Sequence, residues 1–200
     1  MTRSPLHDPT WTYVGAAAMD DFRPQDWAVL TAQRAPYQAD LQAAHVMRLL
    51  SASKDDPSFG YHVNNYRHSV QAATLALADG RDEDYVVATL LHDIGFIACP
   101  TTHGAFAARL LAPYVDEKTV WIVEHHPVFL DRHCEGHPTI DRDAREMWRG
   151  HPHFEAAAEF VARYDQNTVD ADAPEADLSV FEPLVRRVFA RPPRIAPARP

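Results

Sequence analysis

The stretch DEDYVVATLLHDIGF, residues 82–96, decides how this 200-residue sequence is interpreted. It opens on Asp82, a preferred helix N-cap residue, and carries further acids in the first turn, where the helix dipole favours them. The apolar run that follows predicts a buried helix, which carries the dipeptide His92-Asp93. Because a buried carboxylate needs a partner, we expect Asp93 to contact a positive charge, and a metal ion is the simplest one.

The rest of the chain also has the pattern of helices rather than strands. Only 7 glycines occur, and no segment alternates between apolar and polar residues for long. We predict an all-α fold of about seven to nine irregularly packed helices, two of them capped by Asp116 and by Thr101 or Thr102. The expected helices cover residues 25–53, with an interruption near Pro36, then 64–78 before Gly80, 82–96, 103–114, 116–126 before Pro127, 141–148, 152–165 and 178–189.

We expect one domain with an arm at each end. Residues 1–22 carry two prolines and predict an N-terminal arm, and the domain itself covers residues 23–190. Residues 191–200 are rich in proline and arginine, which predicts an extended tail. A homo-oligomer, in which these arms pack on a neighbouring copy, stays open.

Charge and composition exclude several classes of partner. The formal charge is −9, from 28 acids against 19 bases, whereas nucleic acids and anionic membranes select basic surfaces. No apolar stretch approaches the roughly 20 residues of a membrane span, and the first residues lack the apolar core of a secretory signal. Two cysteines, Cys99 and Cys134, do not make a disulfide framework in a chain of this length. We therefore expect a cytoplasmic protein.

Histidine is unusually frequent, with 12 among 200 residues, against roughly 2% in ordinary usage. Neutral imidazole is the commonest metal ligand in proteins. His68 lies on a predicted helix, His92-Asp93 on the next one, and Asp165 at the end of a later one. These two imidazoles and two carboxylates are sufficient for one divalent metal ion.

The order His68, His92-Asp93, Asp165 resembles the H…HD…D pattern of the HD-domain superfamily, an all-α fold of metal-dependent enzymes. The dipeptide alone is common by chance. Its setting LLHDIG, preceded 24 residues earlier by a helical histidine, makes the resemblance specific. The resemblance covers roughly residues 55–190 and implies an HD-domain helical bundle.

Further histidines lie between the dipeptide and Asp165. His103 follows His92 by 11 residues, and His125 and His126 close the next predicted helix. The order H…HD…H…H…D is similar to that of the HD-domain di-iron oxygenases, which include inositol oxygenase and the phosphonate-cleaving (PhnZ-type) enzymes. The resemblance favours His126 over His125 as the ligand, and both stay open.

This resemblance implies a mixed-valent Fe(II)/Fe(III) pair bridged by Asp93. Such a pair would use O2 to cleave a C–P or C–C bond in a small hydroxylated, anionic substrate, for example a 1-hydroxy-aminophosphonate. The ligands it implies are His68, His92, Asp93 and Asp165 for one iron, and His103 and His126, with Asp93, for the other.

Four more residues are candidates for binding the substrate. Gln71 lies one helical turn beyond the first ligand, and Arg163 lies in the segment RYDQ, which is similar to the family's last ligand segment. Arg132 and Arg163 could make a cationic pocket. Tyr61 stands where the phosphonate enzymes have a glutamate of their lid, and Phe96 replaces a histidine that helps to hold the phosphonate. The resemblance therefore predicts the metal ligands more closely than the residues that bind the substrate.

A phosphohydrolase is the alternative, because dinuclear HD phosphodiesterases share a similar ligand order. In such an enzyme one or two Mn, Mg or other divalent ions polarise a phosphoryl oxygen and generate hydroxide. A nucleotidase or phosphodiesterase would then replace the oxygenase. A non-catalytic metal-binding module is the third interpretation. The motif that contains Gln71 favours the oxygenase.

Overall fold

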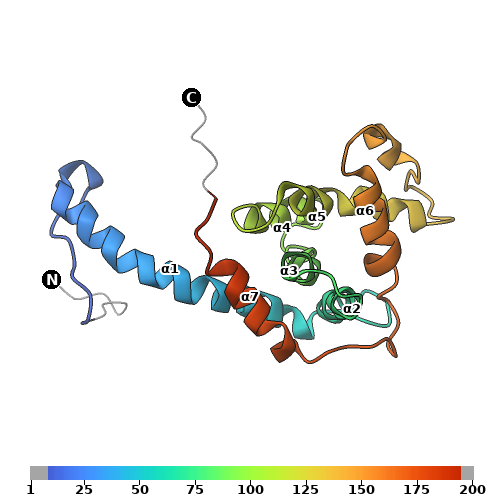
Figure 1. Cartoon of the computed structure of the whole chain (residues 1–200), viewed down its shortest axis with the longest axis horizontal. Helices are drawn as coiled ribbons and strands as arrows, with labels where there is room; N and C mark the ends of the chain where they lie inside the picture. Colours follow the sequence, from blue (N-terminus) through green and yellow to red (C-terminus); the bar gives the residue numbers. More distant parts are fainter. Residues whose placement is uncertain (1–8, 195–200) are drawn as a thin grey trace. The chain divides into compact units, whose positions relative to one another are not determined.

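A computed structural model describes residues 9–194, apart from the side chains of residues 37–40 (Figure 1). Every regular element in this range is helical, so the all-α prediction is confirmed, and the number of helices falls within the expected seven to nine. Five short 3-10 turns, η1–η4 and η6, join the longer elements. The longer elements are α1 (Pro24–Ala52), α2 (Asn65–Ala78), α3 (Glu83–Leu91), α4 (His103–Leu111), α5 (Glu117–Leu130), α6 (Phe154–Phe160), the π-helix η5 (Val161–Asp165) and α7 (Glu182–Phe189).

The chain divides into two compact units, Met1–Gln42 and Ala43–Pro200. The expected boundary between arm and domain lay earlier, at residues 22–23. Most of the predicted C-terminal tail, residues 195–200, and the first eight residues of the predicted arm lie outside the described range. Within that range, no helix combines the length and the hydrophobicity that a membrane span requires.

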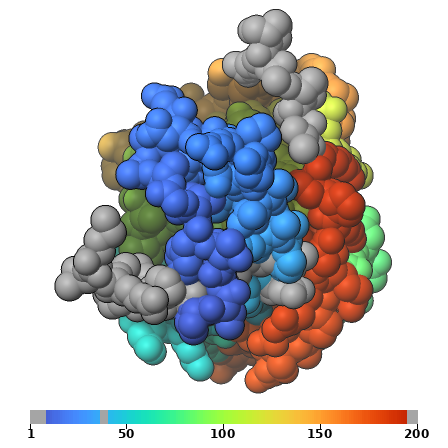
Figure 2. Space-filling model, turned by 90° about the vertical axis from the view of Figure 1, so that its left-hand side faces the viewer, coloured from blue at the N-terminus to red at the C-terminus, as the bar shows by residue number. Residues whose placement is uncertain are grey.

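The N-terminal unit consists of an arm folded against the first half of α1 (blue in Figure 2). The backbone N–H of Thr12 donates to Gln33 Oε1 at 2.6 Å, and Gln33 Nε2 donates back to the carbonyl of Thr12 at 2.9 Å. The rings of Phe22 and Trp27 lie 5.0 Å apart. No side chain of residues 9–36 is buried, so these residues contribute no core of their own.

The expected interruption of α1 near Pro36 is wrong, because the helix runs through this residue. Proline in a helix interior removes one N–H donor and crowds the carbonyl four residues earlier. The pyrrolidine ring of Pro36 is exposed, and the hydrogen bonds before and after it keep the helix continuous.

The second unit is organised around α3, whose residues from Tyr85 to Leu91 are all buried. Helices α2, α5 and α7 pack on this helix from different sides (Figure 1). The expected N-caps Asp82 and Asp116 are confirmed, since each carboxylate accepts an N–H of its own first turn; Thr102 stands at the N-cap of α4 without a side-chain bond. Gly80, at φ +70°, closes α2 as expected, because a residue with a Cβ is strained there.

The prediction that Pro127 stops α5 is wrong, because α5 continues to Leu130. Pro127 has no N–H to give to the carbonyl of Val123. The imidazole Nδ1 of His126 takes that place and lies 2.7 Å from this carbonyl oxygen. A side chain thus replaces the missing backbone donor, and the helix is not broken.

The expected helix over residues 152–165 is present in two parts. It is α-helical from Phe154 to Phe160 and then π-helical to Asp165. The N–H of Gln166 donates to the carbonyl of Val161, five residues earlier, at 3.1 Å. π-Helical turns are rare in proteins, but many of those that occur lie at functional sites. This one ends on two buried residues, Tyr164 and Asp165.

Candidate metal centre

Six histidine and aspartate side chains, all in the second unit, meet at one place. They come from five segments that are far apart in the sequence, and their side chains are between 0% and 13% exposed. They are His68 on α2, His92 and Asp93 after α3, His103 at the start of α4, His126 on α5 and Asp165 at the end of η5.

His68, His92 and Asp165 form one side of the cluster. The Nε2 atoms of the two histidines lie 3.1 Å apart. Asp165 Oδ1 is 3.4 Å from Nε2 of His68 and 3.8 Å from Nε2 of His92. Three potential ligand atoms therefore surround one point.

His103, His126 and Asp93 form the other side. Asp93 Oδ1 lies 3.1 Å from Nε2 of His126 and 3.2 Å from Nε2 of His103. These two nitrogens are themselves 3.2 Å apart. This second group is as compact as the first.

Asp93 lies between the two groups. Its Oδ1 faces His103 and His126, while its Oδ2 is 3.7 Å from Nε2 of His68. The backbone carbonyl of Asp93 accepts a hydrogen bond of 3.0 Å from the side-chain amide of Asn65, which fixes the turn that carries the carboxylate. One carboxylate can thus contribute an oxygen to each side.

Each of the four imidazoles is held in one tautomer. In every case Nδ1 faces a backbone carbonyl, which can only accept, so Nδ1 carries a hydrogen and Nε2, which faces the cluster, is the nitrogen left to bind a metal ion. The carbonyls belong to Thr168 for His68 at 3.1 Å, and to Thr89 for His92, Pro100 for His103 and Val123 for His126, each at 2.7 Å.

The residues fit a metal ion. Four lone pairs and two carboxylates that face one another repel unless a positive charge lies among them. Asp165 Oδ2 is buried and has no hydrogen-bond partner. A metal–nitrogen bond of about 2.0–2.1 Å places two ligands of one ion about 3.0–3.4 Å apart. The two Nε2–Nε2 distances, 3.1 and 3.2 Å, fall in this range.

The electrostatics of the cluster also favour a cation. Burial lowers the pKa of His92, but the carboxylates of Asp93 and Asp165 outweigh it and raise this pKa to about 9. The pKa of His103 is raised in the same way, mainly through Asp93. Burial opposes ionisation of Asp93 and Asp165, yet the imidazoles hold the pKa of both carboxyls well below the usual range. In the absence of metal, protons therefore occupy this site.

The structure brings His126, and not His125, into the cluster. The ring of His125 stacks on Trp121, with centroids 4.2 Å apart and an interplanar angle of 17°. Its Nδ1 donates to the carbonyl of Trp121 at 2.9 Å. The two neighbouring histidines thus point in different directions.

The four candidate substrate residues make no hydrogen bond to the six ligands. Gln71 is buried, and its amide donates to the carbonyl of Asp170 at 3.0 Å while its Oε1 has no partner. Arg163 pairs with Asp79 at 2.6 Å, Arg132 pairs with Asp143 at 2.8 Å, and Tyr61 is 65% exposed. Their contribution to substrate binding stays a prediction.

Two groups that support the cluster were not predicted from the sequence. Thr168 contacts His68, and the edge of the Phe160 ring packs against His92, with centroids 5.5 Å apart. Phe160 is an ordinary core residue in the sequence pattern, and Thr168 lies 100 positions from its partner. Only the three-dimensional arrangement brings them to the ligands.

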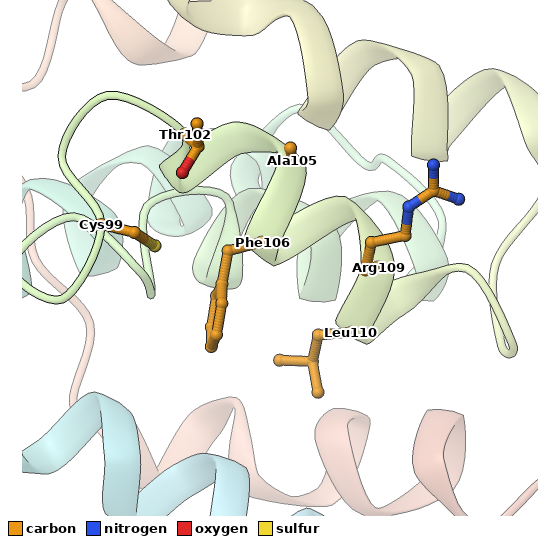
Figure 3. Close-up of a pocket in the computed structure, with 6 residues that line it drawn as sticks. All are labelled: Cys99, Thr102, Ala105, Phe106, Arg109 and Leu110. Carbon is orange, nitrogen blue, oxygen red and sulfur yellow. The ribbon is translucent and has the colours of Figure 1, made fainter.

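A separate pocket of about 600 Å³ lies on the outer face of α4, and none of the six cluster residues lines it (Figure 3). Its lining is mostly apolar, with the guanidinium of Arg109 at the edge. The other lining residues are Cys99, Thr102, Ala105, Phe106 and Leu110.

The sequence of this chain matches no protein-family model and no curated protein. The chemistry of the six clustered residues and the resemblance in their order are therefore what points to a function.

Proposed function

We propose that this chain is an HD-domain di-iron oxygenase, which uses two irons and O2 to cleave a C–P or C–C bond in a small hydroxylated, anionic substrate. The observation that carries the proposal is the position of Asp93, whose carboxylate lies between two groups of imidazole nitrogens. A carboxylate in this position can bridge two ions. The resemblance of the ligand order to that of di-iron oxygenases supports iron.

The charge of the ligand set is consistent with an anionic substrate. The four imidazoles are neutral when they bind a metal through Nε2, so only Asp93 and Asp165 bring negative charge. Two carboxylates do not neutralise a mixed-valent pair, and the centre keeps a positive charge that attracts an anion. When bound, the metal pair supplies Lewis acidity toward a substrate oxygen and a place for O2.

The exposure of the ligands indicates the side from which a substrate enters. His68, Asp93 and His103 have side chains that are 11–13% exposed, while His92, His126 and Asp165 are nearly inaccessible. The aromatic ring of Phe160 packs behind the two buried histidines and excludes water there. Substrate therefore approaches over the first three residues, where Phe96 packs edge-on against His103.

Metal analysis of protein produced in iron-rich medium tests the proposal. We expect two irons per chain and the electron paramagnetic resonance signal of a mixed-valent pair. The Asp93→Asn variant is the control, because an amide does not supply the bridging charge, and it should lose the coupled signal. A single non-iron metal per chain would overturn the proposal.

A second assay separates oxygenase from hydrolase. Consumption of O2 is measured with iron-loaded protein, and phosphate release with manganese-loaded protein, on one panel of hydroxylated phosphonates, polyols and phosphate esters. O2 uptake by the iron-loaded protein supports the oxygenase, and with a phosphonate substrate phosphate is released together with it, because cleavage of the C–P bond yields phosphate. Phosphate release without O2 uptake would assign the same residues to a phosphohydrolase.

A further inference from the structure

Three of the four cluster imidazoles are oriented by their own segment of the chain. Their Nδ1 atoms donate to the carbonyl three residues earlier: Thr89 for His92, Pro100 for His103 and Val123 for His126. A backbone carbonyl is present whatever side chain its residue carries. These three histidines therefore keep their tautomer when the residue three positions earlier is substituted.

His68 is oriented differently. Its Nδ1 faces a residue 100 positions later, and this residue offers two acceptors: the carbonyl of Thr168 at 3.1 Å and the hydroxyl Oγ1 at 2.9 Å. The side chain of Thr168 is fully buried, so no water replaces it readily. This ligand histidine therefore has a side-chain partner for its Nδ1.

The hydroxyl of Thr168 also contacts the segment that carries Asp165. Its proton is directed to the carbonyl of Asp165 at 2.8 Å or to that of Tyr164 at 3.1 Å. The oxygen lone pair is then free to accept from Nδ1 of His68. One hydroxyl thus joins two ligands of the same side of the cluster, one on α2 and one on η5.

The orientation of His68 depends on its bond to the hydroxyl of Thr168 because of where His68 lies. Its side chain is 13% exposed and lies at the open side of the cluster, whereas His92 is fully enclosed. Packing alone therefore restrains His68 less than the other imidazole of its group. A second bond across the same interface, from Gln71 to the carbonyl of Asp170, holds the backbone after Thr168 but does not reach the imidazole.

We infer that Thr168 is a positioning residue that sets the affinity of one of the two metal ions, the one held by His68, His92 and Asp165. The inference rests on the proposed two-metal function. The other ion is held by Asp93, His103 and His126, whose orientation does not involve Thr168. A substitution at Thr168 should therefore weaken metal binding at the first site and leave it unchanged at the second.

Anaerobic titration of the metal-free chain with Fe(II), followed by calorimetry and metal analysis, provides the test. We expect two ions in the wild type. In Thr168→Val the carbonyl of residue 168, 3.1 Å from Nδ1 of His68, remains as an acceptor. One ion should therefore bind with unchanged affinity and the other about 10-fold more weakly, the lower end of the usual effect of losing a bond that orients a ligand histidine. Thr168→Ser keeps the hydroxyl and should restore the second ion.

Thr74→Val is the matched control. Thr74 lies on α2, like His68, and its hydroxyl also joins α2 to the segment that follows Asp165. It donates to the carbonyl of Val70 at 2.7 Å and accepts from the N–H of Ala176 at 3.0 Å, and it bonds to none of the six ligands. Losing this hydroxyl should leave both ions bound as in the wild type.

The outcomes distinguish the inference from the proposed function. If Thr168→Val binds both ions like the wild type, or weakens both equally, the selective role of Thr168 is wrong while a two-ion wild type still supports the proposed function. If the wild type binds fewer than two ions, the proposed function fails. If Thr168→Val then binds the remaining ion with the affinity of the wild type, the inference about Thr168 is overturned as well.

Discussion

At the scale of single residues, we expect substitution of two adjacent histidines on α5 to have opposite effects on metal content. His126 points Nε2 at Asp93, whereas His125 stacks on Trp121. His126→Ala removes one metal ligand and should lower the metal content by about one ion per chain. His125→Ala removes a half-buried ring that stacks on Trp121 and touches none of the six ligands, so it should keep both ions. Metal analysis of the two purified variants checks this, and loss of metal from His125→Ala would contradict the assignment.

The buried imidazole of His92 predicts how the stability of the metal-free protein depends on pH. Its pKa is raised from 6.5 to about 9 by the two carboxylates, despite burial. A raised pKa in the folded state stabilises the fold fully below 6.5, and this contribution is lost as the pH rises through 9. Because each tenfold change in proton affinity corresponds to about 1.4 kcal/mol, the expected loss is a few kcal/mol. Chemical denaturation of the metal-free chain between pH 6 and 10 measures it, and a stability that stays flat would refute it.

At the scale of helices, the close approach of α4 and α5 depends on Gly104. A Cβ at this position would lie 2.9 Å from the carbonyl oxygens of both Val123 and Glu124, and the backbone there cannot yield easily. Gly104→Ala should therefore cost about 1–3 kcal/mol, as overpacking usually does. Because α4 begins at His103 and α5 carries His126, it should also weaken metal binding.

Gly150→Ala is the control for this helix contact, because a Cβ built at Gly150 has no atom within 4 Å apart from the glycine and its chain neighbours. Thermal unfolding should separate the two variants, with Gly104→Ala melting several degrees lower and Gly150→Ala close to the wild type. Equal melting temperatures would show that α4 can move away from α5 at no cost.

The positions of the helices were largely predictable, because their signals are local. Two expected helices differ: α3 ends at Leu91, just before His92-Asp93, and the expected helix over residues 141–148 is a 3-10 helix from Ala144 to Trp148. Asp82 and Asp116 cap helices where expected, and Gly80 closes one. The two prolines inside helices were misjudged for the same reason. Whether Pro127 breaks α5 depends on a replacement donor, and the imidazole of His126 supplies it. Sequence spacing alone does not show that compensation.

At the scale of the whole second unit, the sequence indicated the six clustered residues but not what orients them. Histidine and aspartate at helical positions carry a signal that can be read from the chain. The carbonyls that fix the imidazole tautomers carry none, since every residue has one. Thr168 and His68 meet only because α2 packs against η5. Orientation of the ligands is thus a property of packing.

Because the ligands come from five segments, metal should stabilise the second unit as a whole. A ligand that binds only the folded state adds about 2.7 kcal/mol at 100 times its dissociation constant, or roughly 5–10 °C in melting temperature for a protein of this size. Removing metal with a chelator should lower the melting temperature by that amount, and His126→Ala should respond less.

Hydrogen exchange measured with and without metal gives the location of the effect. Protection should fall in the five ligand-bearing segments, which are α2, the turn after α3, the start of α4, α5 and η5. It should stay unchanged over residues 9–36, which contain no ligand. A uniform loss that included residues 9–36 would contradict a metal held by these six side chains alone.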